Sequence, residues 1–207
     1  MSSVLDNPEL YSTLDPDGML KAITEFPQSA RNAIKNTEKI ELNLECIKYN
    51  SILIAGMGGS AVGGLLLRDW LRDTLKIPVE VSRGYNLPAW INKDTLIYAV
   101  SYSGNTEETL SQYREAVELG CTVICFCSGG KLEDYAKKNN QKLVYFPKGQ
   151  QPRAAIPYQF YNLAGVTRRI GLIDDTKWAE VEESITVVEK LSENMKSETP
   201  LKDNLGK

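Results

Sequence analysis

The sequence contains no histidine, which removes the side chain that most often serves as a general acid or base and as a metal ligand. Its few cysteines do not have the spacing of a zinc site. Two of them stand two positions apart in a strand-like run and share one face. We therefore expect buried, reduced thiols and no metal site. The cysteines are Cys46, Cys121, Cys125 and Cys127.

The sequence also lacks long apolar runs and an excess of basic residues. No apolar run approaches the roughly 20 residues of a membrane-spanning helix, and residues 1–10 lack the basic and apolar regions of a secretion signal. The net charge is -3, with acidic and basic residues mixed along the chain. Such a chain offers no basic stripe for nucleic acid. We expect a cytoplasmic protein that binds neither membranes nor nucleic acid.

Short apolar runs alternate with longer amphipathic stretches, which is typical of a parallel sheet covered by helices on both faces. The 207 residues suffice for a sizeable hydrophobic core. The sequence predicts a doubly wound α/β domain with five strands, preceded by a helical stretch over residues 18–36 that is broken or bent near Pro27. The strand-like runs are SILIAG, PVEVS, TLIYAVS, TVICFCS and KLVYFP. The helical stretches that follow are 61–75, 107–119, 132–138, 155–171 and 177–196.

This pattern divides the chain into three parts. We expect a helical segment over residues 1–45, the α/β domain over residues 46–172, and a C-terminal helix over residues 173–207 that ends in a linker at 202–207. Glu180, Glu182 and Glu183 fall on this last helix, where a solvated charged face is expected.

The first candidate site is the glycine-rich stretch GMGGSAVGG, residues 56–64, directly after the first predicted strand. Gly56, Gly58 and Gly59 let the backbone turn tightly and approach a ligand, and Ser60 opens a helix whose N-terminus favours anions. A phosphate fits this arrangement. The alternative is that the glycines serve only close packing between strand and helix.

The same stretch also matches a dinucleotide-binding fingerprint. Gly56, Gly58 and Ala61 fit G-x-G-x-x-G/A, and Glu80, with Arg83 nearby, lies where an acidic residue would bind a ribose. An NADP-dependent oxidoreductase is therefore an alternative function.

The second candidate site is SYSGNTEET, residues 101–109, after the third predicted strand. Ser101, Ser103 and Thr106 place three hydroxyls within six positions at the start of another helix. Because the carboxyl ends of parallel strands share one edge of the sheet, both loops should face the same ligand. A capping box formed by Asn105 and Glu108 is the alternative.

The third candidate site is QQPRAAIPY, residues 150–158, after the last predicted strand. Pro152 and Pro157 stiffen the chain around Arg153, which precedes a helix. An arginine held at that edge can stabilise negative charge that develops on a substrate oxygen. A solvated or structurally paired arginine is the alternative.

Together, GMGGSAVGG, SYSGNTEET and PRAAIPY resemble the sugar isomerase (SIS) domain, a flavodoxin-like fold, and in particular the bifunctional phosphoglucose/phosphomannose isomerases. The likeness runs from LDPDGML through RGYNLPAW to the helix after Arg153. It implies that the serine and threonine loop holds a sugar phosphate, that the glycine-serine turn lies against the sugar, and that Arg153 stabilises an enediolate. The implied substrate-binding residues are Gly58, Gly59, Ser60, Ser101, Ser103 and Thr106.

The resemblance implies an aldose–ketose isomerase that interconverts glucose 6-phosphate or mannose 6-phosphate with fructose 6-phosphate, without cofactor or metal. A homodimer is expected. In that family a second SIS domain supplies a glutamate base and a ring-opening histidine, and this chain ends where that domain would begin. We therefore expect the N-terminal half of the isomerase. A sugar-phosphate sensor without catalysis is the alternative from the class of binding modules.

Overall fold

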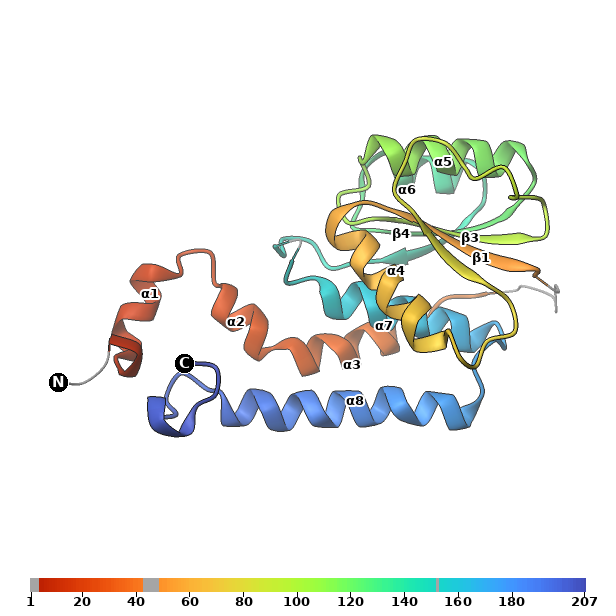
Figure 1. Cartoon of the computed structure of the whole chain (residues 1–207). Coiled ribbons are helices and arrows are strands. Elements are labelled where there is room, and N and C mark those ends of the chain that lie inside the picture. The colour runs from red at the N-terminus through yellow and green to blue at the C-terminus, as the bar shows by residue number, and fades with distance from the viewer. Residues whose placement is uncertain (1–3, 43–48, 152) are drawn as a thin grey trace.

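The computed structural model describes residues 4–42, 49–151 and 153–207, which contain a five-stranded parallel sheet (Figure 1). The strands lie in the order β2-β1-β3-β4-β5. Because β2 lies on one side of β1 and all later strands lie on the other, the sheet is doubly wound. The predicted fold class is thus confirmed. The strands are β1 (Ser51–Gly56), β2 (Val79–Ser82), β3 (Thr95–Ser101), β4 (Thr122–Cys127) and β5 (Lys142–Tyr145).

Helices cover both faces of the sheet (Figure 1). One face carries α5 and α6, and the other carries α4 and α7, with α3 and α8 packed outside them. These helices are α3 (Phe26–Glu38), α4 (Gly58–Leu71), α5 (Glu107–Glu118), α6 (Gly130–Lys138), α7 (Ile156–Arg169) and α8 (Asp175–Asn194). Each predicted helical stretch has a counterpart, with ends that differ by a few residues.

The two faces of the sheet give two apolar core clusters because side chains alternate along each strand. Ile52 and Ile54 point into the cluster that contains α3, α7 and α8, whereas Leu53 points into the cluster under α5 and α6. Every residue of β1 and β3 is buried. This explains why the central strands read as continuous apolar runs rather than as alternating ones.

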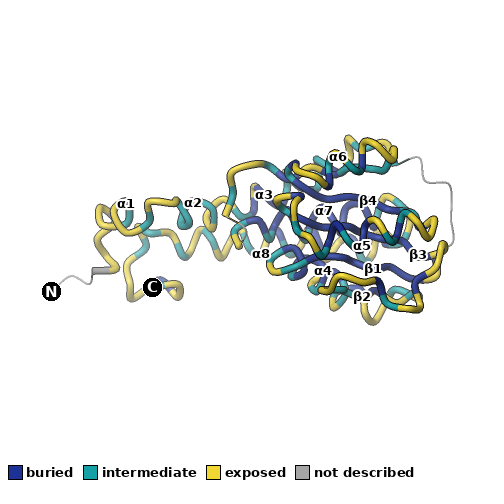
Figure 2. The backbone as a smooth tube through the Cα atoms, turned by 90° about the horizontal axis from the view of Figure 1, so that it is seen from above, coloured by how far each residue is buried: buried dark blue, intermediate teal, exposed yellow. Residues whose placement is uncertain are grey.

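The helical pattern expected over residues 18–36 forms two helices, α2 (Met19–Thr24) and α3. The break falls at Glu25, and Pro27 lies in the first turn of α3. Proline is tolerated there because the first helical N–H groups have no intrahelical acceptor. Figure 2 shows α2 and the preceding α1 (Tyr11–Leu14) as a mostly exposed extension from the buried sheet.

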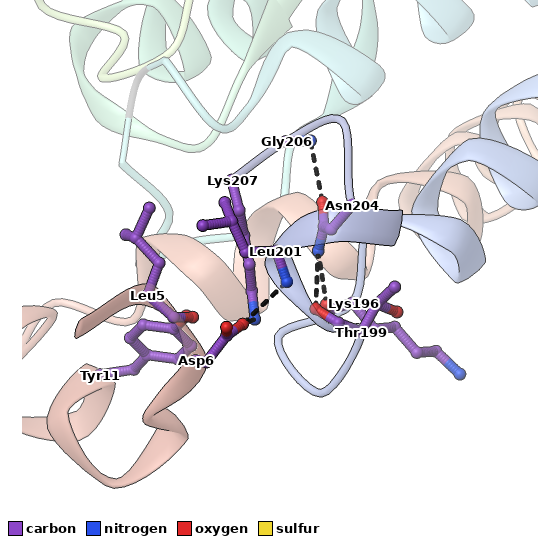
Figure 3. Close-up of polar contacts among 9 residues, drawn as sticks. All are labelled: Leu5, Asp6, Tyr11, Lys196, Thr199, Leu201, Asn204, Gly206 and Lys207. Carbon is purple, nitrogen blue, oxygen red and sulfur yellow. Dashed lines mark hydrogen bonds and ion pairs between the residues drawn. The ribbon is translucent and has the colours of Figure 1, made fainter. Parts of the chain in front are cut away.

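The two ends of the described chain lie against each other (Figure 3). The Asp6 carboxylate accepts a hydrogen bond from the Leu201 N–H at 2.8 Å and pairs with Lys207 Nζ at 3.2 Å. The hydrogen bond from Leu201 is the main cause of a lowered Asp6 pKa. Asn204 Nδ2 donates to the Lys196 carbonyl at 2.8 Å. Residues 202–207, expected to form a linker, therefore fold back onto the N-terminal segment.

Three of the cysteines are buried free thiols, as expected: Cys121, Cys125 and Cys127. Cys46 lies outside the described residues. Burial raises the pKa of Cys127 to about 11, so this thiol stays protonated and unreactive in ordinary buffers. Within the described residues, no helix has the length and apolar character needed to cross a bilayer.

In a Cys46→Ser variant, we expect the remaining thiols to resist a thiol-specific reagent in native, mildly alkaline buffer and to react fully in denaturant. The physical reason is that both access and ionisation are limited by burial. Labelling followed by mass spectrometry measures this. Rapid native labelling of any one of them would contradict the buried placement.

Candidate functional site

The candidate site lies at the edge of the sheet where β1 and β3 end. These neighbouring strands continue into α4 and α5, which cover opposite faces of the sheet, so the two connections diverge at this edge. Neither α4 nor α5 has a side-chain cap on its first N–H groups among the described residues. Among the same residues, the starts of α3, α6 and α7 also lack a side-chain cap, whereas α8 is capped by Asp174, which accepts from the Lys177 N–H at 2.8 Å. Two helix N-termini with open N–H groups therefore meet where an anion would bind.

The glycine-rich turn leads from β1 into α4. Gly58 is exposed with a φ of 50°, and a Cβ added there would meet nothing within 4 Å. Gly59 is half-buried, and Ser60 is 7% exposed. The Ser60 hydroxyl accepts a hydrogen bond from the Tyr102 N–H at 3.2 Å. The first and second loops, predicted to face one ligand, are thus joined directly to each other.

The hydroxyls of the second loop differ in their surroundings. Ser101 is fully buried, and its Oγ lies 2.8 Å from Thr106 Oγ1. Ser103 is exposed, and its Oγ accepts from the Asn105 N–H at 3.2 Å. Ser103 and the half-buried Thr106 therefore offer accessible hydroxyls, whereas the buried Ser101 holds Thr106 in place through their shared hydrogen bond.

The capping box proposed for Asn105 and Glu108 is wrong. The residue at the N-cap of α5 is Thr106, and Asn105 lies one position too early. Asn105 instead donates to the Ser103 carbonyl at 3.2 Å and accepts from the Lys131 N–H at 3.1 Å. These contacts tie the second loop to the start of α6, a relation that the sequence pattern did not reveal.

The acidic residues at the start of α5 lie against a tyrosine of the loop after β2. Tyr85 Oη donates to Glu107 Oε2 at 3.4 Å. The charge of Glu108 is the largest cause of a raised Tyr85 pKa, followed by burial and by Glu107. Both carboxylates thus lie close to Tyr85 in the loop after β2. Their repulsion of a phosphate depends on how far from this tyrosine the phosphate binds.

The third loop follows β5 and carries Arg153, which is exposed. The Gln151 carbonyl accepts from the N–H groups of Ala154 at 2.9 Å and Ala155 at 3.1 Å, so Arg153 lies inside a closed turn just before α7. No ion pair of Arg153 with another described residue is present. Pro152 lies outside the described residues, whereas Pro157 occupies the first turn of α7.

Glu80, the acidic residue of the dinucleotide-binding alternative, lies outside the candidate site. Glu80 is the second residue of β2 rather than part of the loop after it, and it lines a cavity of about 420 Å³ with Arg68 and Arg72. This cavity adjoins the C-terminal end of α4, away from the helix N-termini, so Glu80 does not lie where a ribose-binding acid is expected. Glu180 of α8 accepts from Trp70 Nε1 and Lys177 Nζ, as expected for a structural surface residue. Among the described residues, no cluster of acidic or cysteine side chains could hold a metal.

Sequence reasoning missed Tyr102, which stands between two of the predicted site residues. Its N–H bonds to Ser60, and its hydroxyl reaches the third loop. The available signal was an aromatic residue amid the small polar residues of SYSGNT.

A family model described as the SIS domain matches residues 45–145. The bifunctional phosphoglucose/phosphomannose isomerase of Caldicellulosiruptor bescii is 40% identical over 91% of this chain and 56% of its own length. The corresponding protein of Aquifex aeolicus is 37% identical over 72% of this chain and 44% of its own length. The chain is thus homologous to these isomerases and spans about half the length of the curated relatives it matches.

Solved structures share the fold. Tagatose-6-phosphate ketose/aldose isomerase from Escherichia coli superposes with a TM-score of 0.57 and 17% sequence identity, over 84% of this chain and 54% of that one. At this level of identity the likeness concerns the fold alone.

Proposed function

We propose that the protein is an aldose–ketose isomerase of sugar phosphates, from the premise that residues 45–145 match the family model of the SIS domain. The proposed reaction interconverts glucose 6-phosphate, and also mannose 6-phosphate, with fructose 6-phosphate. Support for the choice of substrates comes from the homologous isomerases, which carry these activities in their names.

The observation that carries the proposal is the meeting of two uncapped helix N-termini, joined by the hydrogen bond from Tyr102 to Ser60. The N–H groups at the start of α5, with the hydroxyls of Ser103 and Thr106, suit the phosphate. The open space over Gly58 suits the sugar.

The isomerisation needs a base that moves a proton between C1 and C2 of the open-chain sugar. The C2 proton of the aldose leaves, an enediolate forms, and a proton returns at C1 to give the ketose. Oxidation at one carbon balances reduction at the other, so no redox cofactor is required. In this proposal Arg153 stabilises the enediolate oxygens, and the two loops hold the phosphate end. The base and the ring-opening group are supplied by the second SIS domain expected from the resemblance.

The test is a calorimetric titration of the chain with fructose 6-phosphate, with NADPH and inorganic phosphate as parallel ligands. We expect saturable binding of fructose 6-phosphate, competition by inorganic phosphate, and no binding of NADPH. Binding of NADPH alone would instead support the oxidoreductase reading of residues 56–61.

Catalysis is tested by joining this chain to the remainder of the 40% identical relative in place of the matching part. We expect this chimera to convert fructose 6-phosphate to glucose 6-phosphate. A folded chimera that binds the sugar phosphate without turnover would support the sensor instead.

Thr106→Val replaces the hydroxyl of this side chain with a methyl group. We expect it to weaken fructose 6-phosphate binding about tenfold, because a hydrogen bond to a charged phosphate is lost. The matched control is Thr109→Val on the same helix, since the Thr109 hydroxyl is buried without a hydrogen-bond partner among the described residues. Calorimetric titration of both variants with fructose 6-phosphate measures the two affinities. Equal affinities would place the phosphate outside this loop.

A further inference from the structure

Tyr102 lies at the centre of the loops that meet at the candidate site. Its N–H donates to Ser60 Oγ at 3.2 Å, which connects it to the loop after β1. Its carbonyl accepts from both the N–H and the hydroxyl of Ser128, at 2.9 and 2.6 Å, which connects it to the loop after β4. The backbone of Tyr102 is therefore held from two sides.

The side chain of Tyr102 reaches the loop after β5. Its hydroxyl donates to the Pro147 carbonyl at 2.8 Å and accepts from the Gln150 N–H at 2.8 Å. Its ring stacks on Phe146, with centroids 6.0 Å apart and an angle of 14° between the planes. One side chain thus contacts the segment after β5 at Phe146, Pro147 and Gln150, where the third loop begins.

The third loop has few other fixed points before α7. Lys148 and Gly149 are exposed. The Gln151 carbonyl closes the turn onto the N–H groups of Ala154 and Ala155, and Arg153 lies within this turn. Because Arg153 is exposed, the backbone of the turn determines where its guanidinium can reach. The bonds of Tyr102 end one residue before this turn.

We propose that Tyr102 is a positioning residue, whose hydroxyl holds the turn that carries Arg153 at the edge where β1 and β3 end. The role of Arg153 toward the enediolate rests on the proposed function. Since the Tyr102 N–H binds Ser60 and its hydroxyl binds the third loop, this residue couples the first and second loops to the arginine. A cation stabilises charge that develops in the transition state more effectively when its position is already fixed, because no reorganisation is needed during the reaction.

The test compares Tyr102→Phe, which keeps the ring but removes the hydroxyl, with Tyr113→Phe. Tyr113 is a matched control because its hydroxyl donates to the Tyr135 carbonyl at 3.1 Å and accepts from Asn139 Nδ2 at 3.0 Å. Its ring also stacks, on Tyr135, with centroids 6.2 Å apart. It lies on α5 against α6, away from the third loop.

The first readout is amide hydrogen exchange in the ligand-free chain. We expect the Gln150 amide of Tyr102→Phe to exchange about tenfold faster, because its acceptor is lost. The Ala154 and Ala155 amides should also exchange faster, and Tyr113→Phe should leave all three unchanged. Unchanged exchange in Tyr102→Phe would overturn the proposal, whatever ligand the protein binds.

The second readout separates positioning from general stability. We would measure the affinity for fructose 6-phosphate and for 5-phosphoarabinonate, whose carboxylate resembles the enediolate. Tyr102→Phe should lose about tenfold in affinity for the carboxylate analogue, with a change of less than about threefold for fructose 6-phosphate. Equal losses for both ligands would overturn the link to Arg153. If the wild-type chain binds neither sugar phosphate, the proposed function fails, and the exchange rates alone decide the role of Tyr102.

Discussion

Gly104→Ala is expected to destabilise the protein by about 4 kcal/mol or more, at the upper end for single substitutions. Gly104 has a φ of 71°, and an added Cβ would lie 1.7 Å from the Gly129 carbonyl oxygen and 2.8 Å from its carbon. The obstacle is backbone rather than a flexible side chain. The Gly104 N–H donates to the Ser101 carbonyl at 3.0 Å, and its own carbonyl accepts from the Leu132 N–H at 2.9 Å. The loop therefore cannot move aside without losing hydrogen bonds. Urea denaturation measures the change in the free energy of unfolding.

Two other glycines separate the collision from backbone strain. Gly120 has a φ of 75° but open space around an added Cβ, so Gly120→Ala should cost about 1 kcal/mol from the left-handed conformation alone. Gly84 has open space and no positive φ, so Gly84→Ala should change stability by less than about 0.5 kcal/mol. A cost for Gly104→Ala no larger than that of Gly120→Ala would contradict the close approach of the loops after β3 and β4.

Arg153→Ala is expected to lower the turnover number of the isomerase chimera by about 100-fold or more, with only a small change in the Michaelis constant. The physical reason is that a cation facing charge present only in the transition state adds little to substrate binding. Steady-state kinetics with fructose 6-phosphate measures both constants. An unchanged turnover number with a raised Michaelis constant would show that Arg153 binds substrate rather than the enediolate.

Arg83→Ala is the matched control for this prediction. Arg83 is also exposed and directly follows β2, so its removal changes the net charge equally at the same edge of the sheet. A general electrostatic effect would slow both variants, whereas a specific contact would slow only Arg153→Ala. Arg153→Lys keeps the charge but loses the planar guanidinium and should recover only part of the activity.

Local patterns in the sequence were sufficient to predict the strands and the helices. SILIAG and TLIYAVS are buried along their whole length as β1 and β3, because continuous apolar runs bounded by glycine and serine suit strands covered on both faces. The glycine turn before α4 was predictable because only glycine adopts a positive φ there at low cost. Local patterns failed for the N-cap of α5, because Asn105 and Thr106 are both suitable capping residues and stand side by side.

The sequence by itself therefore determined the alternation of strands and helices, the three loops that follow strands and the residue types proposed to face a sugar phosphate. Only the tertiary structure decided how the loops touch. Ser60 and Tyr102 are 42 positions apart, and Tyr102 and Gln150 are 48 apart. Ser60 and Tyr102 meet because the order β2-β1-β3-β4-β5 places β1 beside β3. Gln150 follows β5, two strands from β3, and meets Tyr102 through the hydroxyl of the long tyrosine side chain. Strand order depends on which faces and edges bury the most apolar surface across the whole chain, and no local period encodes it.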